Sequence, residues 1–234
     1  MKIALLGYGK MGQTIAKFAK ERDHEVVFIL DKDKEEGSLT KAEVAINFSI
    51  PKAAVNNIKL ALNKKIPVIC GTTGWLEHYK EITAFCKNKD AAFLYASNFS
   101  LGVNLFFKIN QLTAKLMKPH SNEFKPSIQE IHHVHKLDAP SGTAITLAES
   151  FLETGHFTSW KLNGQSDDKL NIKSLREAEV PGTHSITYNS QVDKISLKHE
   201  AFSRDGFALG AVIAAEWILN KKGVFSMQDV LNIS

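Results

Sequence analysis

The sequence predicts an α/β protein whose amino-terminal half is a doubly wound parallel sheet, followed by an α+β part with a mixed or antiparallel sheet. Short, continuous apolar runs in the first half, such as 3–6 and 92–95, alternate with helix-compatible segments. Such runs are typical of parallel strands that are buried on both faces. Residues 183–189 and 192–199 instead alternate polar and apolar side chains, which indicates antiparallel strands with one solvated face.

This change in strand type predicts two domains. A long helix over 101–117 leaves the parallel part, and an apolar helix over 207–219 is expected to return to it. We therefore expect a dinucleotide-binding domain made of residues 1–100 with 206–234. Residues 101–205 are expected to form a substrate-binding and oligomerisation domain, with the apolar face of its sheet as the candidate contact between subunits.

Composition narrows the class of protein. The chain has 234 residues, of which 44% are hydrophobic and 23% charged, as in ordinary globular proteins. Its net charge of +4 is small and its basic residues are scattered, so nucleic acid is not an expected partner. No apolar run approaches the roughly 20 residues of a membrane helix, and the two cysteines, Cys70 and Cys86, imply no disulfide framework. A cytoplasmic protein without a membrane partner is expected.

A glycine motif directly follows the first predicted strand, residues 3–6. Gly7 permits a tight turn, Gly9 lets the backbone approach a pyrophosphate, and Gly12 lets the following helix pack closely on the strand. Asp31 ends the second predicted strand, about 20 residues further on, where an acid binds the adenosine ribose. Glycines, strands, helix and acid together predict a Rossmann-type site for NADH or NADPH, although such a turn can also bind nothing.

The same segment leaves the choice of cofactor open. The carboxylate of Asp31 repels a 2′-phosphate and favours NAD, whereas Lys32 and Lys34 could receive that phosphate. The expected cofactor contacts here are Gly7, Tyr8, Gly9, Lys10, Met11, Gly12, Asp31 and Lys32.

Two later strands end in small or polar loops, at 71–74 and 96–100. In open α/β sheets, ligands bind at the carboxyl ends of the strands. These loops are therefore candidates for the nicotinamide side of the site, with ordinary strand-to-helix turns as the alternative. The candidate residues are Gly71, Thr72, Thr73, Ala96, Ser97, Asn98 and Phe99.

The segment 130–143 is dense in side chains that can exchange protons or bind ions. It reads as a strand that runs into a loop containing His132, His133 and Lys136, followed by a helix with Ser141 as its N-cap. A helix N-terminus binds anions through its free backbone N–H groups. The sequence therefore predicts a pocket for a carboxylate or phosphate with proton donors beside it.

The segment also allows two other interpretations. The histidines could be hydrogen-bonded structural residues, and the loop could be a solvated surface. A metal site is disfavoured, because His133 and His135 share a strand face while His132 points the other way, and Lys136 adds positive charge. We predict no metal.

Taken together, these motifs resemble the 4-hydroxy-tetrahydrodipicolinate reductase family, also called dihydrodipicolinate reductases, of bacterial lysine and diaminopimelate biosynthesis. The resemblance covers the whole chain, and the His-His-x-x-Lys-x-Asp-Ala-Pro-Ser-Gly-Thr segment carries it most specifically. The matching segments are 7–12, 71–74, 98–104, 130–144, 203–204 and 225–231.

The resemblance implies hydride transfer from NADH or NADPH to C4 of a cyclic imine, after loss of the 4-hydroxyl as water. By similarity, His132 and Lys136 are the acid/base pair, His133 binds substrate, and Gly142 and Thr143 hold a substrate carboxylate. It also implies a homotetramer built through the sheet of the second domain.

A dicarboxylate substrate needs two anion sites. The helix start at Gly142 and Thr143 supplies one, and Lys136, His133 and Arg204 are expected to supply the other. The chain departs from the family in a glycine motif that is one residue shorter than usual and in a short region between Asp31 and Val44. The competing functions are another small NAD(P)-dependent dehydrogenase, such as one acting on aspartate, and a dinucleotide sensor without catalysis.

Overall fold

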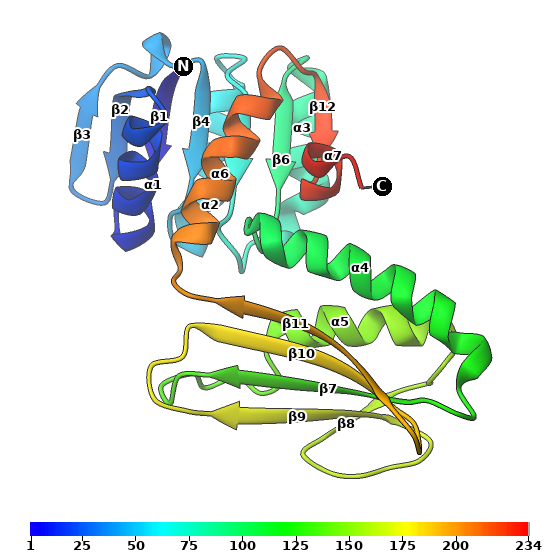
Figure 1. Ribbon diagram of the computed structural model, residues 1–234. Coiled ribbons are helices and arrows are strands. Elements are labelled where there is room, and N and C mark those ends of the chain that lie inside the picture. The colour runs from blue at the N-terminus through cyan, green and yellow to red at the C-terminus, as the bar shows by residue number, and fades with distance from the viewer. Residues whose placement is uncertain (234) are drawn as a thin grey trace. The chain divides into compact units, whose positions relative to one another are not determined.

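The computed structural model describes residues 1–233, and their contacts divide the chain into two units. The first unit contains Met1–Asn104 and the chain from Asp205 onward, and the second contains Leu105–Arg204. Each unit has a sheet of its own (Figure 1).

The sheet of the first unit has seven strands in the order β12-β6-β5-β4-β1-β2-β3. All neighbours are parallel except β2 and β3, which run antiparallel. The strands are β1 (Lys2–Leu6), β2 (Glu25–Asp31), β3 (Lys34–Gly37), β4 (Val44–Asn47), β5 (Val68–Cys70), β6 (Ala92–Tyr95) and β12 (Gly223–Phe225).

Helices cover both faces of this sheet. The α-helices are α1 (Lys10–Glu21), α2 (Pro51–Leu62), α3 (Tyr79–Asn88), α6 (Asp205–Ile218) and α7 (Met227–Leu231), with short 3-10 turns at Leu39–Lys41 and Leu76–His78. Alternate residues of β1 enter opposite cores: Ile3 packs with α1 and α6, whereas Ala4 packs with α2 and α3. This arrangement confirms the predicted doubly wound sheet.

Two edge strands differ from the expected pattern. β3 has the sequence Lys-Glu-Glu-Gly, which contains no apolar side chain, and it is largely exposed at the antiparallel edge. β12 and α7 were expected as one terminal element over 225–231, but three residues pair with β6 before the helix starts. Neither strand is long or apolar enough for periodicity to reveal it.

The second unit has a mixed sheet in the order β11-β10-β7-β9-β8. β7, β8 and β9 are parallel, and β10 runs antiparallel to β7 and β11. The strands are β7 (Lys125–His132), β8 (Trp160–Leu162), β9 (Leu170–Arg176), β10 (Gly182–Asn189) and β11 (Lys194–Ala201). The helices are α4 (Leu101–Met117), whose first residues up to Asn104 belong to the first unit, and α5 (Gly142–Glu153), with a 3-10 turn at Lys118–His120.

The apolar face of this sheet is covered from within the chain. Ile128 and Ile186 share a buried cluster with Phe106 of α4 and Leu147 of α5. The expectation that this face contacts other subunits was therefore wrong, because the helices of the same unit already bury it. The opposite face is more polar, as the hydrogen-bonded hydroxyls of Ser127 and Thr187 illustrate.

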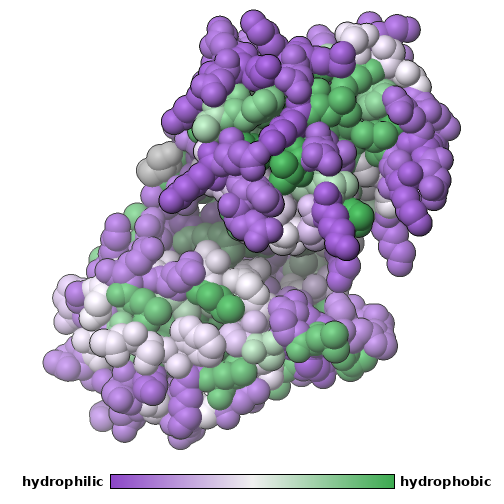
Figure 2. Space-filling model, turned by 180° about the vertical axis from the view of Figure 1, so that it is seen from behind, coloured by the Kyte–Doolittle hydropathy of each residue, from purple (hydrophilic) through white to green (hydrophobic). Residues whose placement is uncertain are grey.

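Hydrophilic side chains cover much of the surface visible from behind, with apolar side chains in small patches (Figure 2). Within residues 1–233, no helix is long and apolar enough to cross a membrane. Both cysteines are buried free thiols, and burial raises the pKa of Cys70 to about 12.

Candidate active site

The glycine loop joins β1 to α1 in the first unit. Gly7 has a φ of +106°, and a Cβ on Gly12 would lie 2.3 Å from the backbone oxygen of Gly7. Gly9, which caps α1, has no atom within 4 Å of its Cβ position. Gly7 and Gly12 thus serve the turn and the packing of the helix, while Gly9 leaves open space beside the first free N–H groups of α1.

Asp31 lies beside this loop, at the end of β2. Its carboxylate accepts hydrogen bonds from the backbone N–H groups of Tyr8, at 3.0 Å, and Lys32, at 2.8 Å. Lys34 Nζ lies 4.9 Å from the centre of the Tyr8 ring. The fold therefore brings the predicted adenosine-side residues together. Lys10 and Met11 form the first turn of α1.

The two other predicted cofactor loops follow β5 and β6, whose carboxyl ends lie at the same edge of the sheet as that of β1. The Thr72 side chain is buried, and its hydroxyl accepts a hydrogen bond from the backbone N–H of Ser49 at 2.9 Å. Phe99 is 1% exposed, and its ring packs on Phe48 with centroids 5.6 Å apart. These two side chains are part of the packing beneath the loops, and Gly71 packs against the Phe48 ring, since a Cβ there would lie 2.2 Å from it.

In the second unit, β7 ends at His132 and α5 begins at Gly142. Side chains two apart on a strand share a face. Glu130 and His132 therefore both point to the covered side of the sheet, where Glu130 is 0% and His132 8% exposed.

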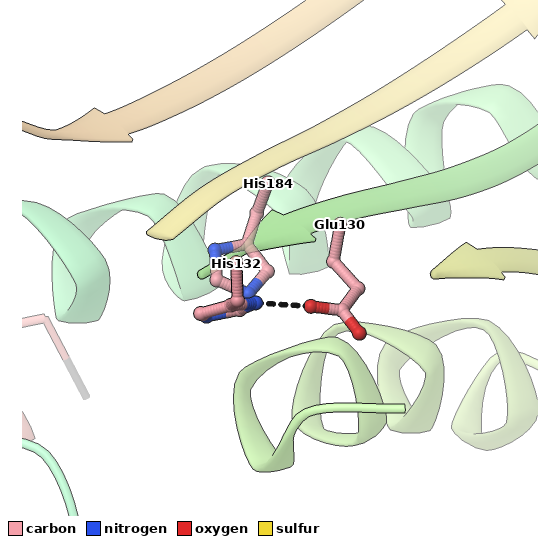
Figure 3. Close-up of side chains that lie close together, drawn as sticks. All are labelled: Glu130, His132 and His184. Carbon is pink, nitrogen blue, oxygen red and sulfur yellow. Dashed lines mark hydrogen bonds and ion pairs between the residues drawn. The ribbon is translucent and has the colours of Figure 1, made fainter. Parts of the chain in front are cut away.

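Glu130, His132 and His184 form a cluster at the ends of β7 and β10 (Figure 3). His132 Nδ1 makes a very short contact with Glu130 Oε2, and the rings of His132 and His184 are 5.0 Å apart and nearly perpendicular. Burial opposes ionisation of Glu130, but hydrogen bonds from His132 and Arg176 prevail and hold its pKa at about 2. Because Glu130 is ionised, it accepts the Nδ1–H proton and leaves Nε2 of His132 as the exchangeable position.

His184 has the opposite electrostatic behaviour. Burial, assisted by the nearby His132, lowers its pKa to about 3, so this imidazole is neutral near pH 7. Its Nε2 lies 3.0 Å from the hydroxyl of Ser141. His184 is thus a neutral polar member of the cluster beside His132.

Ser141 connects this cluster to the start of α5, as its predicted N-cap role requires. Its hydroxyl accepts a hydrogen bond from the N–H of Ala144 at 3.2 Å, and its own N–H donates to Glu130 Oε1 at 3.3 Å. Gly142, the first residue of the helix, has no atom within 4 Å of its Cβ position. Open space therefore adjoins the N–H groups of Gly142 and Thr143, where an anion is expected.

The remaining predicted residues, Lys136, His133 and Arg204, each make a polar contact. Lys136 Nζ contacts both carboxylate oxygens of Asp138, at 2.7 and 2.8 Å, and this hydrogen bond lowers the pKa of Asp138. Arg204 donates to Nε2 of His133 at 3.3 Å. Within residues 1–233, no hydrogen bond joins His132 directly to Lys136, so the expected acid/base pair is not in direct contact.

A metal ion could in principle use the cluster, because one ligand atom from each of Glu130, His132 and His184 lies within 4.8 Å of the others. Arg176, however, donates to the same carboxylate at 3.1 Å. A guanidinium on Glu130 repels a dication there, so the donor set fits a proton-transfer site better than a metal site.

Sequence reasoning overlooked two members of this site. His184 occupies an inward position of β10, in register with Glu130, and a polar residue among the inward Ile186 and Tyr188 was the available signal. Arg176 ends β9 and pairs in register with His132, and nothing in its local sequence indicates this.

Comparisons with known proteins agree with this geometry. Residues 1–99 match the family "Dihydrodipicolinate reductase, N-terminus", and residues 102–231 match "Dihydrodipicolinate reductase, C-terminus". The chain is 53% identical to the 4-hydroxy-tetrahydrodipicolinate reductase of Christiangramia forsetii over 235 residues, which cover 99% of this chain and 98% of that protein.

Solved structures share the fold. A dipicolinate-bound dihydrodipicolinate reductase from Paenisporosarcina sp. TG-14 superposes with a TM-score of 0.81 at 23% identity, over 97% of each chain. The aspartate dehydrogenase of Thermotoga maritima reaches only 0.50 at 12% identity, over 96% of this chain and 99% of that one. Both family matches and the close relative cover nearly the whole sequence, and the chain therefore belongs to the dihydrodipicolinate reductase family of NAD(P)H-dependent enzymes.

Proposed function

We propose that this protein reduces 4-hydroxy-tetrahydrodipicolinate to tetrahydrodipicolinate with NADH or NADPH, in lysine and diaminopimelate biosynthesis. The family match over both units supports the reaction. The single structural observation that carries the mechanism is the ionised Glu130 on Nδ1 of His132, because it directs the exchangeable proton to Nε2.

The reaction needs a proton donor for a clear chemical reason. After water leaves from C4, hydride addition at C4 of the conjugated imine produces an electron-rich enamine. That enamine must take up a proton, and a positioned donor speeds such a step. His132 Nε2 fits this role, and Gly182 keeps room beside it, since a Cβ at Gly182 would lie 3.0 Å from that nitrogen.

Lys136 is proposed as the second member of the acid/base pair. Its ammonium is held by Asp138 on the same loop, with 22% of its side chain exposed. A substrate carboxylate can compete with Asp138 for this ammonium, because both are anions of the same kind. Lys136 can thus both anchor the substrate and donate a proton.

Two anion sites are proposed for the two substrate carboxylates. The N–H groups of Gly142 and Thr143 at the start of α5 would hold one, and His133 with Arg204 and Lys136 would hold the other. The contact between His133 and Arg204 places a permanent cation beside an imidazole, which favours a carboxylate there.

The cofactor belongs to the first unit, along the carboxyl edge of its parallel sheet. Gly7–Gly12, 71–73 and 96–99 are proposed to hold it, with the ribose at Asp31. The carboxylate of Asp31 favours NADH, while Lys32 and Lys34 beside it accommodate the 2′-phosphate of NADPH, so we propose that both cofactors are used.

We further propose a cytoplasmic homotetramer. Two buried thiols without a disulfide support a reducing compartment. The outer face of the β7–β10–β11 sheet is the proposed contact, because α4 and α5 cover the inner one. Light scattering at micromolar concentration should give four times the mass of the 26.0 kDa chain, and a monodisperse monomer would refute the assembly.

The function is tested by following the absorbance of NADH or NADPH with enzymatically generated 4-hydroxy-tetrahydrodipicolinate. Turnover with this substrate and none with oxaloacetate plus ammonia is expected, because the family match over both units assigns the cyclic imine as substrate. Turnover with oxaloacetate plus ammonia alone would identify an aspartate dehydrogenase. Cofactor binding without turnover of either would identify a sensor.

A further inference from the structure

Arg176 ends β9 and donates hydrogen bonds to several groups. It is paired with His132 in the register of the parallel strands β7 and β9. Its guanidinium donates to Glu130 Oε1 at 3.1 Å and to the carbonyl of Leu175 at 2.7 Å. It also donates to the carbonyls of Lys136, at 3.2 Å, and Asp138, at 2.5 Å. One side chain thus touches both the carboxylate behind His132 and the backbone that carries Lys136.

The charge of Arg176 matters because Glu130 is fully enclosed. A buried carboxylate without a cation is costly, and Arg176 supplies that cation. With Arg176 on Oε1, the charge of Glu130 is balanced whether or not His132 carries its second proton.

The hydrogen bonds of Arg176 also hold the loop after β7. Leu137 is 99% exposed, so packing does not fix the backbone around it. The carbonyls on either side, those of Lys136 and Asp138, are the two that Arg176 holds. The planar guanidinium can serve both carbonyls and Glu130 at once, which a lysine ammonium cannot do in the same geometry.

We propose that Arg176 is a positioning residue for the reduction, which orients His132 through Glu130 and Lys136 through the backbone of its loop. Within residues 1–233, it makes no hydrogen bond to the side chain of His132 or of Lys136. The proposal rests on the proposed function for its kinetic consequences, but not for the structural ones.

The kinetic test compares Arg176→Ala and Arg176→Lys with wild type. Misplacement of reacting groups by about 1 Å costs on the order of 10²-fold in rate, and we expect kcat to fall by about that factor in both variants. Millimolar guanidinium should restore part of the kcat of Arg176→Ala, but none of that of His132→Gln. Arg22→Ala is the matched control, because Arg22 makes a similar two-point pair with Glu216 in the other unit and should keep wild-type kcat.

A spectroscopic test needs no turnover. Imidazole nitrogen resonances should show His132 as the Nδ1–H tautomer in wild type and a mixture of tautomers in Arg176→Lys, with circular dichroism confirming the fold. An Arg176→Lys variant with wild-type kcat and the wild-type tautomer overturns the proposal. Activity lost only in proportion to folded protein, without guanidinium rescue, also overturns it. If wild type fails to reduce the substrate, the proposed function fails, while the tautomer of His132 still tests Arg176.

Discussion

Glu130 and His132 lie two positions apart on β7, and the carboxylate of the first accepts a hydrogen bond from Nδ1 of the second. This contact is the consequence of strand geometry, since residues i and i+2 share a face. It fixes which imidazole nitrogen is bound internally and which can exchange a proton with substrate.

Replacement of His132 by glutamine should lower kcat by about 10²–10⁴-fold, the usual contribution of a general acid. The affinity for NADH should stay nearly unchanged, because the cofactor loops belong to the first unit. Steady-state kinetics and fluorescence titration with NADH measure the two quantities. His135→Gln is the control, since His135 is exposed and pairs with Glu179 on the surface. A His132→Gln enzyme with wild-type kcat would remove this residue from proton transfer.

Lys136→Ala separates the two roles proposed for the ammonium. Loss of a transition-state interaction lowers kcat and kcat/KM together, whereas loss of uniform binding raises KM alone. We expect kcat to fall within the same ~10²–10⁴-fold range, with an additional rise in KM from the lost carboxylate contact. An increase in KM at unchanged kcat would leave Lys136 as an anchor only.

The glycine loop offers a matched pair of substitutions. A Cβ at Gly12 would lie 2.3 Å from a backbone oxygen, so Gly12→Ala should lower Tm by several degrees. A Cβ at Gly9 meets nothing within 4 Å, so Gly9→Ala should keep the fold while occupying space meant for the pyrophosphate. We expect its NADH affinity to fall by about tenfold or more, equivalent to at least ~1.4 kcal/mol. Calorimetry and cofactor titration check both, and unchanged NADH affinity in Gly9→Ala would move the cofactor elsewhere.

Acid should destabilise the protein partly through His184. Its folded pKa of about 3 lies below the ordinary value of 6.5, so the unfolded state binds more protons between these pH values. Stability from this residue is therefore complete above pH 6.5 and is lost as the pH falls toward 3. Between pH 7 and 5, wild type should lose about 2 kcal/mol more unfolding free energy than His184→Gln. Urea denaturation measures this, and Glu130 does not interfere, since its own contribution is lost only at lower pH. Parallel pH dependence in the two proteins would contradict the burial of a neutral His184.

Much of the fold follows from local sequence. A doubly wound sheet places an apolar first strand, a glycine turn and an acid at the end of the second strand at defined positions. The structure has β1, the glycines after it and Asp31 at these positions. The charged β3 could not be predicted, because its pairing with β2 depends on hydrogen bonds of the main chain rather than on side-chain pattern.

The candidate site also has one part that could be predicted from local sequence and one part that could not. One short segment contains His132, Lys136 and Ser141. Its titratable residues and its helix cap allow proton transfer and anion binding to be predicted from sequence. His184 and Arg176 join it from β10 and β9 through strand register. The inward position of His184 among Ile186 and Tyr188 was a local signal, whereas nothing in the sequence around Arg176 indicates its place. What covers the apolar face of the second sheet could not be predicted for a similar reason, because an alternating strand reveals an apolar face but not that α4 and α5 cover it.

Isotope transfer tests the central claim most directly. Wild-type enzyme is given enzymatically generated 4-hydroxy-tetrahydrodipicolinate and NADH that carries deuterium at both positions of the nicotinamide C4, and the product is examined by NMR and mass spectrometry. The account predicts tetrahydrodipicolinate with one deuterium, located at C4. Product with deuterium at another carbon, or oxidation of NADH without deuterium in the product, would contradict it.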